Sequence, residues 1–333
     1  MKTFAQKHPV LTFLLITFAW SWLFWFAAIP FRGQTLLVMP IVFIGGYGPA
    51  IGGILALELR SGLKIDSSPK KTVTMVIASL IIFALISLQY LAGNIPNYEA
   101  LAENLIPAAP VVAATLAASL VGGWVISSAV SSNTDIRARM ASILPWRLPP
   151  GWTVVALLFY PVLFLAVWGL ASFWGTEVQY PSSWGSPALD VLPLFALSFG
   201  FTFLVSGGPE EPGWRGLMQP ELQKRFSPLV AALIVTVFWV LWHLPLYLNG
   251  FYPGDLVSGM INSAIMGVPL AIFLAWFYNR SGGNLFLMMF LHTGFNVTSK
   301  FLPKSNVDFL LFWLVLAVIV IMKDKMWRKP IQS

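Results

Sequence analysis

The sequence predicts an all-α fold, a polytopic transmembrane bundle of about ten helices in a single membrane domain. Of its 333 residues, 57% are hydrophobic and only 10% are charged, whereas soluble domains carry roughly 25% charged residues. The mean hydropathy is +0.77. Apolar residues form continuous runs and do not alternate at period two, which argues against membrane β-strands. We therefore expect an integral membrane protein in contact with lipids.

The individual spans follow from the lengths of the apolar runs. A helix of about 17 to 25 apolar residues crosses a hydrocarbon core of about 30 Å. The first run follows the basic segment Met1 to His8 without a small-residue cleavage site, so we expect a retained span and no signal peptide. The runs cover residues 9–30, 35–57, 72–93, 107–131, 152–175, 188–206, 228–248, 256–279, 284–302 and 306–322.

The basic residues predict the orientation of these spans. All but three of the 20 Lys and Arg residues fall in predicted loops on the side of the N-terminus, and the exceptions are Arg32, Lys300 and Lys304. The positive-inside rule then predicts a multi-pass protein of the cell membrane with both termini in the cytoplasm. Although the net charge is +7, its clustering between apolar runs indicates topology and no nucleic-acid partner.

The chemistry open to the chain is limited by its composition. It has no cysteine, which excludes disulfides, thiolate catalysis and Cys-based metal sites. A nucleophile must therefore come from oxygen or activated water. The longest polar stretches, about 94–106, 132–151 and 176–187, are loops and form no soluble domain. We therefore expect the function to lie inside the bundle.

A cluster of charged residues follows the sixth apolar run. Glu210 and Glu211 are adjacent, and Arg215 lies one helical turn later. A charged side chain near lipid costs free energy and usually marks a functional site. Glu211 and Arg215 have the i, i+4 spacing of a helix salt bridge. Glu210 projects about 100° away around the helix, which leaves it free to act.

Two histidines lie within apolar runs, His243 in the seventh and His292 in the ninth. Asn296 lies four residues after His292, so both side chains share one helix face. Gly294, between them, would let another helix approach closely. The simpler interpretation is a hydrogen-bonded pair that only joins helices.

Together these side chains suit the hydrolysis of a peptide bond by water. Glu210 would be the general base, and histidine and asparagine donors would stabilise the oxyanion. Alternatively, Glu210, His243 and His292 would bind Zn²⁺ and leave one position for water. The His-Glu-x-x-His signature of zinc proteases is absent. The residues alone leave both mechanisms open.

The depths of these residues predict an irregular helix near the glutamates. With straight spans, Glu210 would lie at the cytoplasmic end of its run, whereas His243 lies about 22 Å along the next run from that side. Non-helical backbone is tolerated where it lines a cavity inside the protein. We therefore expect residues 207–226 to be partly buried in the bundle. The residues that favour irregularity are Gly207, Gly208, Pro209, Pro212 and Gly213.

The motifs resemble those of the CPBP intramembrane proteases, a family that includes the type II CAAX prenyl endopeptidases and bacteriocin-processing or immunity proteins. The Glu-Glu-x-x-x-Arg motif matches Glu210 to Arg215, and the His-x-x-x-Asn motif matches His292 and Asn296. Between them, the family places an aromatic residue, usually Phe, four residues before a histidine. Trp239 precedes His243 here, and we expect this departure to affect only packing.

The resemblance covers residues 135–300 well, which would form the protease-like core, and Gly48 to Ala50 resemble an early Gly-Pro-Ala segment. Family members commonly have about eight spans. Residues 66–131 would then form an additional helical pair.

The resemblance also implies roles for the site residues. Glu210 would activate water, His243 and His292 would assist it or bind a metal, and Asn296 would stabilise the oxyanion. Glu211 and Arg215 would order the site.

The implied function is a CAAX-type intramembrane endopeptidase that cleaves a membrane-associated protein or peptide near the cytoplasmic surface. A substrate lipidated at its C-terminus is compatible with this function. A non-catalytic immunity or partner-binding protein is one alternative. A proton-coupled transporter is another, because intramembrane Glu and His also relay protons, although no inverted repeat is evident.

Overall fold

The computed structural model describes residues 3–62, 66–92 and 108–329, and this part of the chain is helical, as predicted. Its only β-type pairing is an isolated antiparallel bridge between Gln179 and Lys304. Eight helical segments within the described residues are long and apolar enough to cross a membrane. The fold class is therefore confirmed, whereas the figure of about ten spans stays a prediction.

The helices match the predicted runs with two main differences. The second run is divided at Tyr47, and the ninth is helical only over the 14 residues of α16, which ends at Thr298. The long helices are α2 (Pro9–Ala27), α3 (Thr35–Gly46), α4 (Gly48–Ser61), α5 (Pro69–Leu91), α7 (Ala108–Ser127), α9 (Pro150–Trp174), α10 (Ala188–Phe201), α13 (Pro228–Trp242), α15 (Leu256–Arg280), α16 (Leu285–Thr298) and α17 (Asn306–Asp324). The short ones are α1 (Phe4–Lys7), α8 (Thr134–Met140), α11 (Glu211–Gly213), α12 (Gln219–Gln223) and α14 (Leu244–Leu248).

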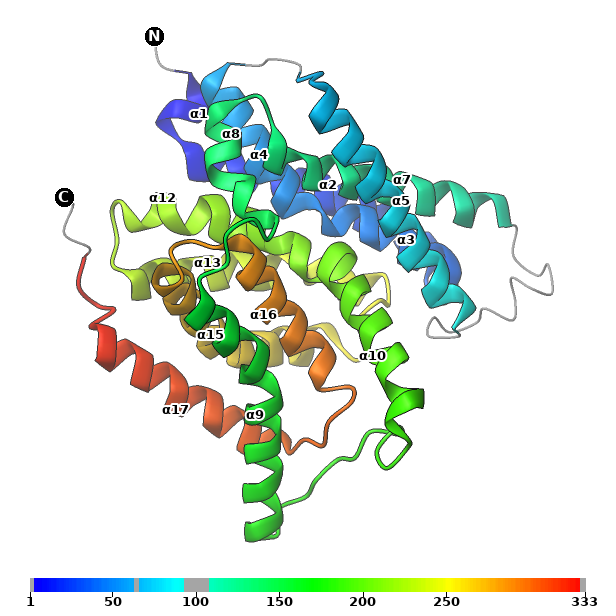
Figure 1. Ribbon diagram of the computed structural model, residues 1–333, viewed down its shortest axis with the longest axis vertical. Coiled ribbons are helices and arrows are strands. Elements are labelled where there is room, and N and C mark those ends of the chain that lie inside the picture. Colours follow the sequence, from blue (N-terminus) through cyan, green and yellow to red (C-terminus); the bar gives the residue numbers. More distant parts are fainter. Residues whose placement is uncertain (1–2, 63–65, 93–107, 330–333) are drawn as a thin grey trace.

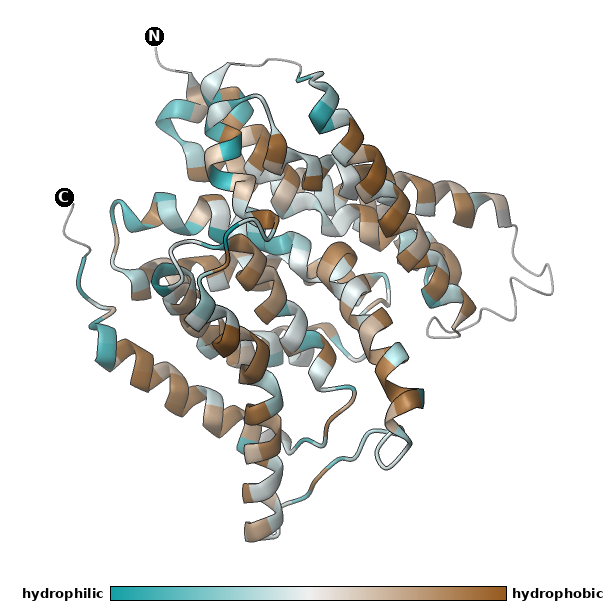
Figure 2. Cartoon of the chain, viewed as in Figure 1, coloured by the Kyte–Doolittle hydropathy of each residue, from teal (hydrophilic) through white to brown (hydrophobic). Residues whose placement is uncertain are grey.

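The helices form two groups, which are visible in Figure 1. Helices α2 to α7 lie together on one side, and α9, α15, α16 and α17 lie on the other. Each group has its own apolar core, one around Ile54 and Trp214 and another around Phe164 and Phe273. In Figure 2 hydrophilic residues gather around α1, α8 and α12, the end of the bundle that carries the N-terminus.

The glutamate segment passes between the two groups, in contact with α4 on one side and α16 on the other. It continues α10 without leaving the bundle, so that residues 188–223 form one helical segment of 36 residues. Two π-helical turns, Thr202–Ser206 and Trp214–Met218, and a 3-10 turn, Gly208–Glu210, interrupt the α-helix. The prediction of an irregular, partly buried segment is thus confirmed.

Glycine allows the close contact between this segment and α4. A Cβ at Gly213 would lie 2.2 Å from the backbone oxygen of Pro49, too close for any larger residue unless the backbone shifts. Pro49 belongs to the Gly48 to Ala50 segment. The tight packing of two backbones therefore fixes the height of the glutamates relative to α4.

Helices α5 and α7 pack against each other along their length, as expected for the predicted pair at residues 66–131. Of that range, residues 93–107 lie outside the described part of the chain. Whether the pair is an addition to the family fold stays a prediction, as does the boundary of the protease-like core.

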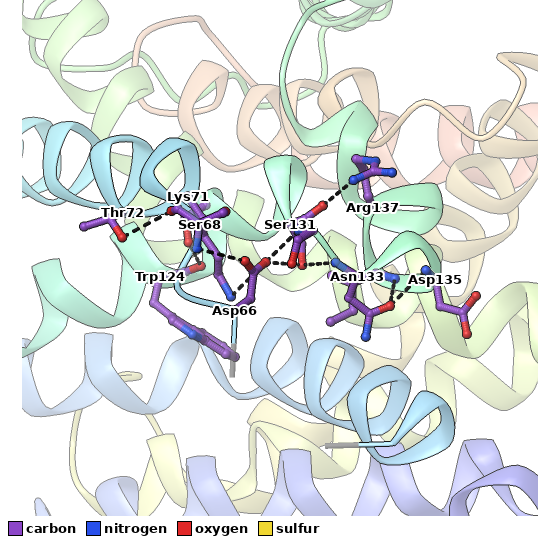
Figure 3. Close-up of polar contacts among 12 residues, drawn as sticks. Asp66, Ser68, Lys71, Thr72, Trp124, Ser131, Asn133, Asp135 and Arg137 are labelled. Atoms are coloured by element: carbon purple, nitrogen blue, oxygen red, sulfur yellow. Dashed lines mark hydrogen bonds and ion pairs between the residues drawn. The ribbon is translucent and has the colours of Figure 1, made fainter. Parts of the chain in front are cut away.

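Asp66 connects the start of this pair to the segment before α8 (Figure 3). Its carboxylate accepts hydrogen bonds from Ser131 Oγ and the Ser132 backbone N–H, both at 2.7 Å, and from the Ser68 N–H at 3.2 Å. Lys71 Nζ lies 3.8 Å away. Burial would raise the pKa of Asp66, but the hydrogen bonds outweigh it and lower this pKa below its ordinary value.

We predict that Asp66→Asn lowers the stability of the detergent-purified protein at pH 7 by roughly 1–3 kcal/mol. A carboxyl group whose pKa is lower in the folded than in the unfolded protein stabilises the fold at any pH above its unfolded pKa of about 4. This stabilisation is lost as the pH falls from there through the pKa of the folded protein. Thermal unfolding from pH 7 to pH 3 measures the difference from wild type, which should shrink at the acid end. Asp190→Asn, at an exposed position in α10, is the control, and equal melting of Asp66→Asn and wild type at pH 7 would contradict the prediction.

Candidate active site

The predicted catalytic residues line one cavity of about 640 Å³. Glu210 comes from the irregular segment, His243 from the end of α13, and His292 and Asn296 from α16. Most of the remaining wall is apolar or aromatic. The lining includes Trp25, Val42, Phe43, Trp239, Trp242, Leu246, Phe251, Tyr252, Met266, Leu270 and Phe295. The tertiary structure therefore brings together four residues that are separated by up to 86 positions in the sequence.

Glu210 is 4% exposed, and its carboxylate is held by Trp239. The indole Nε1–H of Trp239 donates to Glu210 Oε2 at 2.6 Å. The expectation that Trp239 affects only packing is therefore wrong, because a phenylalanine has no N–H to donate. This contact fixes one carboxylate oxygen and leaves Oε1 as the oxygen that can meet a water molecule.

Glu211 forms the predicted salt bridge and a second contact. Its Oε1 lies 3.0 Å from Arg215 Nη1 and 2.6 Å from His292 Nδ1. All three side chains are almost completely buried, with exposures of 0%, 4% and 3%. The sequence predicted the pairing with Arg215 but missed the pairing with His292, since the partners are 81 residues apart.

The hydrogen bonds orient both imidazole rings in the same way. His243 Nδ1 lies 2.7 Å from the carbonyl oxygen of Trp239, which only accepts, so Nδ1 carries the proton. His292 Nδ1 donates to the Glu211 carboxylate. In each ring Nε2 is therefore the nitrogen left for the cavity.

Asn296 approaches the glutamate segment at a glycine. A Cβ at Gly207 would lie 2.7 Å from Asn296 Nδ2 and 3.4 Å from His292 Cδ2. On the opposite side of α16, the ring of Tyr160 occupies the position that a Cβ at Gly294 would take, 2.5 Å from its Cδ2 atom. The prediction that Gly294 permits a close helix contact is confirmed, and α9 is the helix concerned.

Glu210, His243 and His292 have the types of side chain that bind zinc, but they are not arranged as a metal site. A carboxylate and two imidazoles with hydrogen-bonded Nδ1 atoms are typical zinc ligands. In the described residues, however, no three His, Asp or Glu side chains come together in a group that could hold a metal ion. Glu210, His243 and His292 do not form a ready three-ligand site, and we derive no chemical step through a metal.

The cavity extends from buried residues to exposed ones. Glu210, Leu270 and His292, which line it, are almost completely buried. Pro253, Asn262 and Lys300, which also line it, are exposed. The cavity therefore reaches the protein surface, and has its mouth, beside these three residues.

Two residues near the mouth escaped the sequence analysis. The ring of Tyr252 stacks on that of His243 at a centroid distance of 5.8 Å and an angle of 20°. Lys300 was interpreted only as a loop charge, yet it lines the cavity. Its spacing, four residues after Asn296 and eight after His292, was the available signal.

Comparison with known proteins gives two matches. Residues 192–298 match the family model described as type II CAAX prenyl endopeptidase Rce1-like. A protein named CAAX prenyl protease 2 from Methanococcus maripaludis is 29% identical over 185 residues, which cover 52% of this chain and 66% of that protein. The match thus spans slightly less than two thirds of the relative. The family match contains all six site residues predicted from the sequence.

Proposed function

This chain belongs to the CPBP family of intramembrane proteases, which includes the Rce1-like CAAX endopeptidases, and we propose that it is an intramembrane endopeptidase. The observation that supports this most directly is the buried carboxylate of Glu210 at the floor of a cavity shared with two imidazoles and an amide. The cavity is large enough for several residues of a peptide. The chain is a multi-pass membrane protein, so its substrate is a protein or peptide at the membrane.

In the proposed mechanism, Glu210 acts as the general base. The Trp239 N–H holds Oε2, and Oε1 takes a proton from water as the water oxygen attacks the scissile carbonyl carbon. The proton then passes to the leaving amine nitrogen as the C–N bond breaks. Near-complete burial lets the base act away from bulk water.

The remaining residues stabilise charge and hold the geometry. The Asn296 amide can donate to the oxygen of the tetrahedral intermediate, and His243 and His292 present Nε2 to the same cavity. The Glu211 carboxylate supports a positive charge on His292 as a triad aspartate supports its imidazole. Arg215 compensates the charge of Glu211.

The apolar lining suits a substrate with aliphatic side chains near the cleaved bond. The relative from Methanococcus maripaludis is named a prenyl protease, and by analogy the substrate class includes proteins lipidated near the C-terminus. A bound metal, such as Zn²⁺, stays a separate proposal that rests only on the kinds of donor present.

We also propose that both termini are cytoplasmic, from the distribution of basic residues. Cleavage near the cytoplasmic surface stays a prediction.

The proposed catalytic role predicts that Glu210→Gln lowers cleavage by about 10²–10⁴-fold, because the amide cannot accept the proton from water. The thermal stability should be nearly unchanged. The measurement compares membrane proteomes of cells with each variant for a C-terminally trimmed protein, followed by an assay with the purified enzyme. Glu177→Gln, at an exposed loop position, is the control. Full activity of Glu210→Gln would favour the non-catalytic or transporter alternatives.

The contact between Trp239 and Glu210 predicts a smaller effect for Trp239→Phe. The ring volume is largely kept, but the hydrogen bond is lost, which is worth about 1.5–3 kcal/mol when one partner is charged. We expect kcat to fall by roughly 10- to 100-fold with little change in KM. Trp174→Phe, at an exposed position, controls for loss of an indole, and wild-type kcat in Trp239→Phe would show that the N–H does not orient the base.

The orientation predicts which single cysteines react from outside the cell. The chain has no native cysteine, so Ser182→Cys and Ala138→Cys can be labelled without background. Ser182 lies in the loop before α10, whereas Ala138 is exposed on α8. A membrane-impermeant thiol reagent should label only Ser182→Cys in intact cells and both after permeabilisation. Labelling of Ala138→Cys alone in intact cells would instead place both termini outside the cell.

A further inference from the structure

A second cavity, of about 480 Å³, lies where the helical pair meets the segment that contains α8. Its charged lining residues are Lys70, in the first turn of α5, and Arg137 of α8. The other lining residues are apolar, and they are Ala129, Val130, Ala141 and Trp146. This cavity has no lining residue in common with the cavity of Glu210, so it is a separate site.

The charge of this second cavity is positive. None of its lining residues is Asp or Glu, and neither Lys70 nor Arg137 forms an ion pair with a residue in the described part of the chain. The carboxylate of Asp66 is already held by hydrogen bonds and by Lys71. Asp135 projects about 200° away from Arg137 around α8. Two positive charges therefore face the cavity without a compensating carboxylate.

A hydrogen bond fixes the position of Arg137 (Figure 3). Its Nη1 donates to the backbone oxygen of Ser131 at 2.7 Å. A guanidinium has five N–H donors in one plane, and two of them can contact two oxygens of a phosphate together. A side chain that is already held in place loses less conformational entropy when a ligand binds. Arg137 is therefore prepared to bind an anion with paired oxygens.

The helix that carries Lys70 continues as a surface for acyl chains. Val73, Ile77 and Ile81 follow Lys70 at intervals of three and four residues, so all four lie on one face of α5. The three apolar side chains are 57%, 53% and 48% exposed, on a helix long and apolar enough to cross a membrane. In Figure 2 the first turn of α5 is hydrophilic and the turns that follow are hydrophobic. Lys70 thus lies at the upper end of a stripe that faces lipid.

Trp146 indicates the same depth in the membrane. It lines the cavity and is 67% exposed, and exposed indole rings favour the level of the lipid headgroups. Lys70 and Arg137 are also exposed, so water can solvate them. The place of their cavity at the end of an apolar stripe, in addition to its charge, therefore indicates a ligand that joins a phosphate to acyl chains.

We propose that this cavity binds the headgroup of an anionic phospholipid. The phosphate lies between Lys70 and Arg137, and an acyl chain lies along Val73, Ile77 and Ile81. A volume of about 480 Å³ is sufficient for a phosphoglycerol group. In the orientation with cytoplasmic termini the lipid belongs to the cytoplasmic leaflet, where anionic headgroups attract basic residues. The bound lipid joins the helical pair to α8, and its binding does not depend on the catalytic role of Glu210.

A binding experiment with the full-length protein in detergent tests this lipid site. The probes are phosphatidylglycerol and phosphatidylcholine with the same fluorescently labelled chains, of which only the first has a net negative charge. Wild type should bind phosphatidylglycerol at least about tenfold more tightly. The double variant Lys70→Gln, Arg137→Gln should bind phosphatidylglycerol about 30-fold more weakly than wild type, because each basic residue near an anionic lipid contributes roughly a factor of five. It should also lose most of the preference.

Three further variants control for folding, for the type of cation and for surface charge. Lys70→Gln alone removes a side chain without a protein partner in the described residues, so it should fold normally and bind about fivefold more weakly. Lys70→Arg keeps the charge and should keep the preference. The double variant Lys7→Gln, Arg225→Gln removes two exposed positive charges outside the cavity lining, and it should bind as wild type does.

Four outcomes would overturn the proposal. They are equal binding of the two lipids by wild type, wild-type binding in both Lys70→Gln variants, and an equal loss of affinity in the Lys7→Gln, Arg225→Gln variant, which would show a general effect of surface charge. The fourth uses glycerol phosphate, the headgroup without chains, as a competitor. Displacement of the lipid by glycerol phosphate at equal concentration would indicate a site for a free phosphate, whereas a requirement for large excess supports the lipid.

Discussion

The buried carboxylate of Glu211 is the contact on which the geometry of the site depends. One oxygen accepts from both Arg215 and His292, so it joins the glutamate segment to α16. Buried charges are costly unless they are paired and hydrogen-bonded, and both partners are needed to offset that cost. The neighbouring Glu210 is thereby held at a fixed position in the cavity that His292 and Asn296 of α16 also line.

Irregular backbone makes this arrangement possible. In a straight α-helix two adjacent glutamates would point about 100° apart and would both lie near the helix end. Here the π-helical and 3-10 turns carry them into the bundle, and the close backbone contact at Gly213 and Pro49 sets their depth. Backbone of this kind is stable within a membrane protein because it is covered by other helices.

The part of the cavity around Glu210 and the part near its mouth differ in the side chains that line them. Around Glu210, the indole of Trp239 and the fixed imidazoles leave few degrees of freedom for the groups that we propose as catalytic, which is the preorganisation that the proposed catalysis requires. Toward the mouth the wall is mainly aromatic, which suits the burial of apolar side chains.

The helical fold and most span boundaries follow from the sequence alone, and the sequence also identified the six residues that we propose for the site. Continuous apolar runs permit only helices in lipid, and ionisable residues inside such runs are rare enough to stand out, as do Glu210 and His292. The i, i+4 spacing was sufficient to predict the pairing of Glu211 with Arg215, because a helix brings such neighbours together whatever surrounds it.

The contacts between distant helices required the tertiary structure. The hydrogen bond from Trp239 to Glu210, the sharing of Glu211 with His292, and the place of Lys300 in the cavity each depend on how separate helices are rotated and stacked. Local periodicity predicts which residues share one helix face but carries no information on which face of another helix they meet. For that reason the sequence identified the candidate site residues, and only the packed bundle showed which contacts orient them and which cavity they share.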